Sequence, residues 1–150
     1  MKQLLIVFFS LLFLVACNSN NTTGKAIAIE GSWQLLGAVT IQNGDTTASV
    51  NATTEKMIKV INATHFAFLR HDVNKGKDST AVYSSGGGAY TLNGNQYTEQ
   101  LEYCTAREWE GHSFAFTVAI NGDTLLQTGI EKIDSLGVNR TIVEKYKRIR

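Results

Sequence analysis

The chain has 150 residues, the size of one domain, with 14 basic and 13 acidic residues and a formal net charge of +1. A nearly neutral chain without a basic stripe gives no support for a nucleic-acid partner, and we expect none. The chain contains no proline. This favours uninterrupted strands, because proline cannot donate a hydrogen bond within a sheet.

Residues 1–16 are typical of a signal peptide for export. A basic start, Met1-Lys2, precedes an apolar run over 4–15 that only Ser10 interrupts. A membrane-spanning helix needs about 20 apolar residues, whereas this shorter run fits the apolar region of a signal peptide.

The apolar run ends in Leu14-Val15-Ala16-Cys17, which resembles the lipobox of bacterial lipoproteins. The resemblance implies cleavage before Cys17, lipidation of its sulfur and acylation of its amine; the alternative is an ordinary signal peptide with a chance cysteine. We expect residues 17–29 to be a flexible tether that holds the protein at a membrane. We expect the protein to be in the cell envelope of a Gram-negative bacterium. By analogy with lipoprotein sorting, the absence of an Asp after Cys17 favours the outer membrane. The absence of an acidic cluster after Cys17 favours a domain that faces the periplasm.

Residues 30–150 read as short strands with alternating apolar residues, separated by turns such as Asn43-Gly44, Asn93-Gly94 and Asn121-Gly122. We expect residues 84–88, with three glycines, to be a flexible loop before the fourth strand. The pattern predicts a single all-β domain, an eight-stranded antiparallel up-and-down β-barrel, whose interior can hold one small ligand. The predicted strands cover residues 31–41, 56–62, 65–71, 89–92, 96–103, 112–120, 123–132 and 138–149.

The first and last strands are neighbours in a closed barrel, so Arg148 is placed to lie across the indole of Trp33. A single apolar face is expected on the first strand, formed by Trp33, Leu35, Gly37, Val39 and Ile41. Gly31, Trp33 and Arg148 together resemble the lipocalin (calycin) pattern, and the resemblance implies a lipocalin-like barrel over residues 30–150. With Cys17 lipidated, Cys104 has no partner for a disulfide, so the chain is more similar to bacterial lipocalin-like lipoproteins of unknown function than to secreted lipocalins.

Polar residues stand on otherwise apolar strand faces and are the candidate binding residues: Arg70, Tyr97, Glu99, Tyr103, Glu144 and Tyr146. A buried charge must pair, stay hydrated or meet a ligand. One reading has Arg70 neutralise the acidic head group of a ligand while the three tyrosines line the wall; the other pairs Arg70 with Glu99 or Glu144 in a structural network. Trp109, in the 105–111 loop, is either a lid over the barrel mouth or a cap on the core.

The sequence does not decide which face of the seventh predicted strand points inward. The two candidate sets are Leu125, Gln127 and Gly129, or Leu126, Thr128 and Ile130. Widely spaced histidines predict no metal site, and we expect no cofactor. No nucleophile–base arrangement stands out, and we expect Cys104 to face away from Glu99. We therefore expect a monomeric lipoprotein that binds a small hydrophobic or amphipathic ligand. The alternative is a filled barrel that acts as a protein-interaction or structural module, and an enzyme is the least favoured class.

Overall fold

A computed structural model describes residues 27–48, 53–77, 79 and 81–150. The expected signal peptide, Cys17 and most of the expected tether lie outside the described residues.

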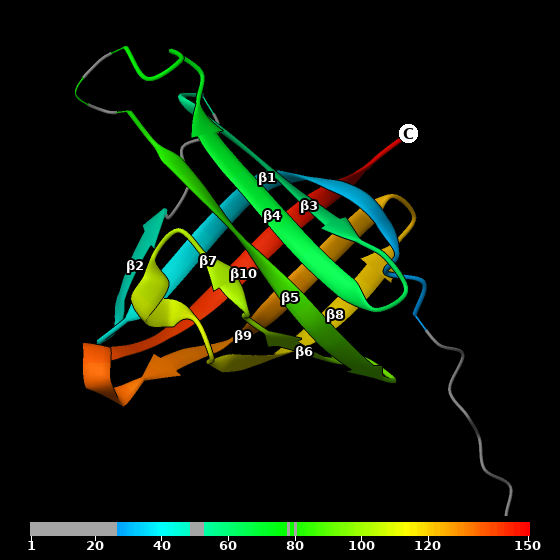
Figure 1. The fold of residues 1–150 in the computed structure, drawn as a ribbon. Helices are drawn as coiled ribbons and strands as arrows, with labels where there is room; N and C mark the ends of the chain where they lie inside the picture. Colours follow the sequence, from blue (N-terminus) through cyan, green and yellow to red (C-terminus); the bar gives the residue numbers. More distant parts are fainter. Residues whose placement is uncertain (1–26, 49–52, 78, 80) are drawn as a thin grey trace, which may run out of the picture.

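Eight strands form a closed barrel in which each strand pairs with the next one in an antiparallel sense, and β10 pairs with β1 to complete the ring (Figure 1). The predicted eight-stranded antiparallel up-and-down barrel is therefore confirmed. The ring consists of β1 (Gly31–Gln42), β3 (Glu55–Ile61), β4 (His65–Asp72), β5 (Tyr83–Asn93), β6 (Gln96–Gln100), β8 (Ser113–Asn121), β9 (Thr124–Ile133) and β10 (Val138–Ile149).

Short additional elements gather at one end of the barrel, which we call the cavity end (Figure 1). They are the strands β2 (Asp45–Ala48) and β7 (Tyr103–Cys104) and the 3₁₀ turns η1 (Arg107–Trp109) and η2 (Asp134–Leu136). In the part of the chain that the structure describes, no helix is long and apolar enough to cross a bilayer.

A β-bulge in β1 changes which set of side chains faces the barrel interior. Leu35 pairs with Tyr146 but Gly37 pairs with Lys145, so Leu36 is an extra residue. A bulge moves the following side chains to the opposite face. Trp33 and Leu35 point inward before it and Ala38 is buried after it, whereas Ile41 is exposed. The single apolar face expected from Trp33 to Ile41 is therefore wrong beyond Leu35.

The glycine run expected as a loop is part of β5 and pairs with β4 (Arg70 opposite Ser84, Phe66 opposite Gly88). Glycine is required here because neighbouring atoms occupy the space of a side chain. A Cβ on Gly88 would lie 1.9 Å from the Gln100 carbonyl oxygen, and one on Gly86 would lie 2.7 Å from the Phe68 ring. The flexible loop over 84–88 is therefore wrong.

Trp33 closes the end of the barrel opposite the cavity end, which we call the closed end. The indole is fully buried, and its Nε1 donates to the Ile29 carbonyl oxygen at 2.8 Å. The expected contact is present, because the Arg148 guanidinium carbon lies 4.0 Å from the Trp33 ring centroid. Ile29 is itself buried, so the folded part begins before residue 30, inside the expected tether.

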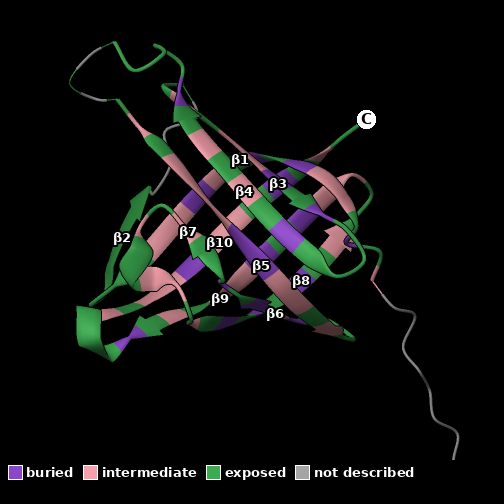
Figure 2. Ribbon diagram, viewed as in Figure 1, coloured by how far each residue is buried: buried purple, intermediate pink, exposed green. Residues whose placement is uncertain are grey.

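Burial alternates along the strands (Figure 2) and decides the open question about β9. Leu125, Gln127 and Ile133 are buried, whereas Leu126 and Ile130 are exposed. The set Leu125, Gln127 and Gly129 therefore forms the inward face of this strand.

Replacing Arg148 tests how the closed end is held. Arg148 donates from Nη1 to Glu30 O at 2.6 Å and from Nη2 to Ala28 O at 3.0 Å, besides covering Trp33. We expect Arg148→Ala to lower the free energy of unfolding in urea by about 1–3 kcal/mol. Arg148→Lys should recover only part of this loss, because lysine lacks the planar fork. Arg150→Ala, which removes an exposed ion pair with Asp123, is the control; an equal effect of both alanine variants would contradict the account.

Candidate functional site

A cavity of about 320 Å³ occupies the barrel interior at the cavity end. Its walls come from β1, β3, β4, β5, β6, β8, β9 and β10, together with β7 and the segment that holds η1. About half of the lining residues are apolar and the rest are polar or charged, which is more polar than the usual small-molecule site. The apolar wall consists mainly of Met57, Phe68, Leu101, Trp109, Phe114, Phe116 and Ile142.

Lys59 lies at the floor of this cavity and is only 2% exposed. Its Nζ donates to Glu99 Oε1 at 2.7 Å and to Gln127 Oε1 at 3.0 Å. Burial alone would lower the pKa of Lys59, but the combined effect of Glu99 and Glu144 outweighs burial and raises this pKa above its ordinary value. Lys59 therefore remains an ammonium inside the barrel.

Glu144 also lies near Lys59, but at a longer distance than Glu99. Its Oε2 accepts a hydrogen bond from Tyr146 Oη at 2.8 Å and lies 3.9 Å from Lys59 Nζ. Burial raises the pKa of Glu144, although Lys59 and the Tyr146 hydroxyl act in the opposite direction. The carboxylate of Glu144 is thus less fully compensated than that of Glu99.

Tyr146 and Tyr97 are buried in the core, as the predicted inward faces require, but neither is among the residues that line the cavity. Burial and the neighbouring Glu144 raise the pKa of Tyr146 well above its ordinary value. Burial and Glu99 likewise raise the pKa of Tyr97, whose buried Oη makes no hydrogen bond of normal geometry with the described residues. Both tyrosines therefore stay neutral and contribute apolar surface to the core.

Two arginines line the outer part of the cavity, and each already has a carboxylate partner. Arg70 faces the interior as predicted, but its ion pair is with Glu55. The predicted pairing of Arg70 with Glu99 or Glu144 is therefore wrong, because Lys59 occupies that position. Arg140 Nε donates to Glu131 Oε2 at 2.6 Å.

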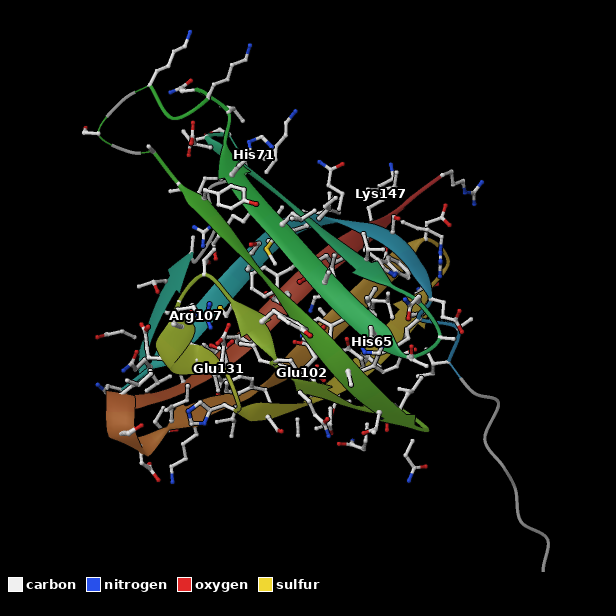
Figure 3. All side chains as sticks on the ribbon, in the orientation of Figure 1. His65, His71, Glu102, Arg107, Glu131 and Lys147 are labelled. Atoms are coloured by element: carbon white, nitrogen blue, oxygen red, sulfur yellow. The ribbon has the colours of Figure 1, made fainter. Side chains whose placement is uncertain are left out.

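The inward rungs of β9 and β10 form a ladder from the floor to the cavity end. Gln127 lies opposite Glu144 and Glu131 lies opposite Arg140, with Gly129 opposite Ile142 between them. The ladder places polar groups at two depths of one wall. Figure 3 shows Glu131 and Arg107 at the cavity end.

Tyr103 lies on the outer surface and is 68% exposed, so its expected place on the interior wall is wrong. The cause is a bulge. Tyr90 pairs with Glu99 and Gly87 pairs with Tyr103, so three residues (100–102) oppose two residues (88–89) of β5. The same bulge turns Cys104 toward the cavity that Glu99 also lines. The prediction that Cys104 faces away from Glu99 is therefore wrong.

Trp109 combines the two roles that the sequence left open. It lines the cavity, and its ring lies 5.8 Å from that of Phe114 and 5.3 Å from the Arg140 guanidinium carbon. The side chain therefore packs on the core and also borders the space in which a ligand would lie.

Sequence reasoning missed Lys59 as the central interior residue. It lies between Ile58 and Val60, which made the opposite strand face look apolar; Val60 is 40% exposed. A weak signal was present, because Met57 and Ile61 share the face of Lys59. Arg140 and Glu131 were missed as well, since each pairs with a residue on another strand, and Gln127 was considered only as a member of one possible inward face.

A second hollow, of about 630 Å³, lies on the outside of the barrel over residues 86–88. Tyr103, Arg107 and Glu110 border it, and Arg107 pairs with Glu110 at 3.0 Å while remaining 81% exposed. The glycines have no side chains, and this leaves the surface hollow. The described residues contain no grouping of three or more His, Cys, Asp or Glu side chains that could hold a metal ion.

Comparison with models of known protein families gives no match for the chain, and comparison with curated proteins gives none either.

Removing Lys59 should destabilise the barrel strongly, because a buried carboxylate then loses its partner. We expect Lys59→Met to lower the free energy of unfolding by about 3–5 kcal/mol. Adding Glu99→Gln in that background should recover part of the loss, because it removes the unpaired charge. Lys56→Met is the matched control, because Lys56 is exposed on the same strand, and it should change stability by about 0.5 kcal/mol or less. Urea unfolding checks these values, and a Lys59→Met protein as stable as the parent would contradict the account.

Proposed function

We propose that this protein is an envelope lipoprotein with a lipocalin-like barrel that binds a small amphipathic molecule in its interior. The observation that carries the proposal is the cavity of about 320 Å³, with an apolar wall and charged groups at its floor. This volume lies near the lower end of the usual range for ligand pockets, roughly 300–1,000 Å³. The role proposed is binding rather than catalysis.

Membership in the lipocalin group is part of the proposal. It is supported by the closed eight-stranded barrel and by the position of Trp33 beneath Arg148 beside Gly31. The alternative, a filled barrel that works as an interaction module, is less well supported because side chains leave the cavity unfilled.

Attachment to a membrane through Cys17 is also proposed, on the Leu14-Val15-Ala16-Cys17 motif. In a bacterial expression host, the chain should lose residues 1–16 and gain the mass of a thioether-linked lipid and an acyl group. Intact-mass measurement checks this, with Cys17→Ser as the variant that should leave the membrane fraction. An unmodified Cys17 in the mature protein would contradict the attachment.

Filling the cavity tests the binding function. We expect native mass spectrometry of the gently purified full chain to show a retained small molecule, and Ala38→Phe to lose it, because Ala38 lines the cavity. Ala119→Phe is the matched control, since Ala119 is exposed on β8. A parent protein that carries no molecule and binds none of a panel of envelope lipids and fatty acids would contradict the function, as would retention of the same molecule by Ala38→Phe.

A further inference from the structure

The charges around the cavity are unevenly matched. Three cationic side chains line it, and each has a carboxylate at ion-pair distance: Lys59 with Glu99, Arg70 with Glu55, and Arg140 with Glu131. Glu144 is a fourth carboxylate, and it shares Lys59 at the longer distance of 3.9 Å. The cavity lining therefore has three cations and three carboxylates, but Arg70 pairs with Glu55 outside the lining, so Glu144 has no short ion pair of its own.

Glu144 also has an unused acceptor. Its Oε2 accepts the Tyr146 hydroxyl, whereas no described residue donates to its Oε1. The side chain lines the cavity and keeps 14% of its surface accessible. Glu131 is similar at the outer end of the ladder, since Arg140 bonds only its Oε2 and the side chain is 16% exposed.

An anionic ligand would meet a different situation. At Lys59 it would have to displace Glu99, which would leave that carboxylate buried without a counter-ion. At Arg70 and Arg140 it would meet cations whose charge Glu55 and Glu131 already neutralise. A metal ion is not favoured either, because the described residues bring together no group of three or more His, Cys, Asp or Glu side chains. An organic cation needs one carboxylate acceptor and an apolar wall, and both are present.

We propose that the cavity binds a small primary amine with an apolar chain, whose ammonium is held by Glu144 Oε1 while the chain lies against Phe68, Phe114, Phe116 and Ile142. This inference rests on the proposed binding function and names its ligand class. The cavity volume equals roughly that of ten water molecules. An amine of about ten non-hydrogen atoms therefore matches the space.

The ionisation of Glu144 supports this assignment. In the empty barrel, burial raises the pKa of Glu144, so its charged form is disfavoured. An ammonium at Oε1 favours the charged form, so amine binding and deprotonation of Glu144 are linked. The groups that act on this titration are Lys59 on β3, Glu99 on β6 and Glu131 on β9, together with Tyr146 on the same strand as Glu144.

The test is isothermal titration calorimetry of the full chain with three probes of matched size: octylamine, octan-1-ol and octanoate. We expect octylamine to bind at least tenfold more tightly than octanol, and octanoate most weakly. Glu144→Gln should weaken octylamine binding roughly ten- to a hundredfold and leave octanol binding unchanged. Octylamine affinity should rise with pH through the titration of Glu144 in the parent protein, and this dependence should vanish in Glu144→Gln. Glu108→Gln, an exposed carboxyl on η1, should change nothing.

The outcomes separate the two proposals. If octanoate or octanol binds as tightly as octylamine, or if Glu144→Gln leaves octylamine affinity unchanged, the amine assignment is overturned while the binding function stands. If none of the probes binds, the assignment is overturned, and retention of another molecule in native mass spectrometry decides whether the binding function survives.

Discussion

The neutralisation of the Lys59 ammonium is the constraint on which the barrel interior depends. A buried charge is tolerated only where opposite charge and hydrogen-bond acceptors surround it, and here β6, β9 and β10 supply Glu99, Gln127 and Glu144. These partners are far apart in the sequence. The ion pair therefore links strands across the interior, and it also leaves a charged floor under an apolar cavity.

The two ends of the barrel differ in how their side chains fill the interior. At the closed end, Trp33 fills the interior, and Arg148 covers its ring while bonding the carbonyl groups of Ala28 and Glu30. At the cavity end, Arg70 and Arg140 are held to the wall by carboxylates. Side chains therefore fill the closed end, while the cavity end retains an unfilled space of about 320 Å³.

Much of the fold could be predicted from the sequence because strand alternation and Asn-Gly turns are local signals. The contact between Trp33 and Arg148 was predictable because a closed ring makes the first and last strands neighbours. The bulges at Leu36 and at 100–102 were not, since each depends on how a partner strand pairs. Because of these bulges, the faces predicted for Val39, Tyr103 and Cys104 are wrong. Lys59 was missed because nothing local shows which carboxylates surround it.

The central claim is that Glu144 is the under-compensated carboxylate of a ligand site. The most direct measurement is a ¹³C NMR pH titration of the glutamate side-chain carboxyl groups, with the Glu144 signal assigned by Glu144→Gln, in the presence and absence of octylamine. The account predicts that the pKa of Glu144 lies above its ordinary value in the empty protein and falls when the amine binds. A Glu144 that titrates in the ordinary range and does not respond to the amine would contradict the account.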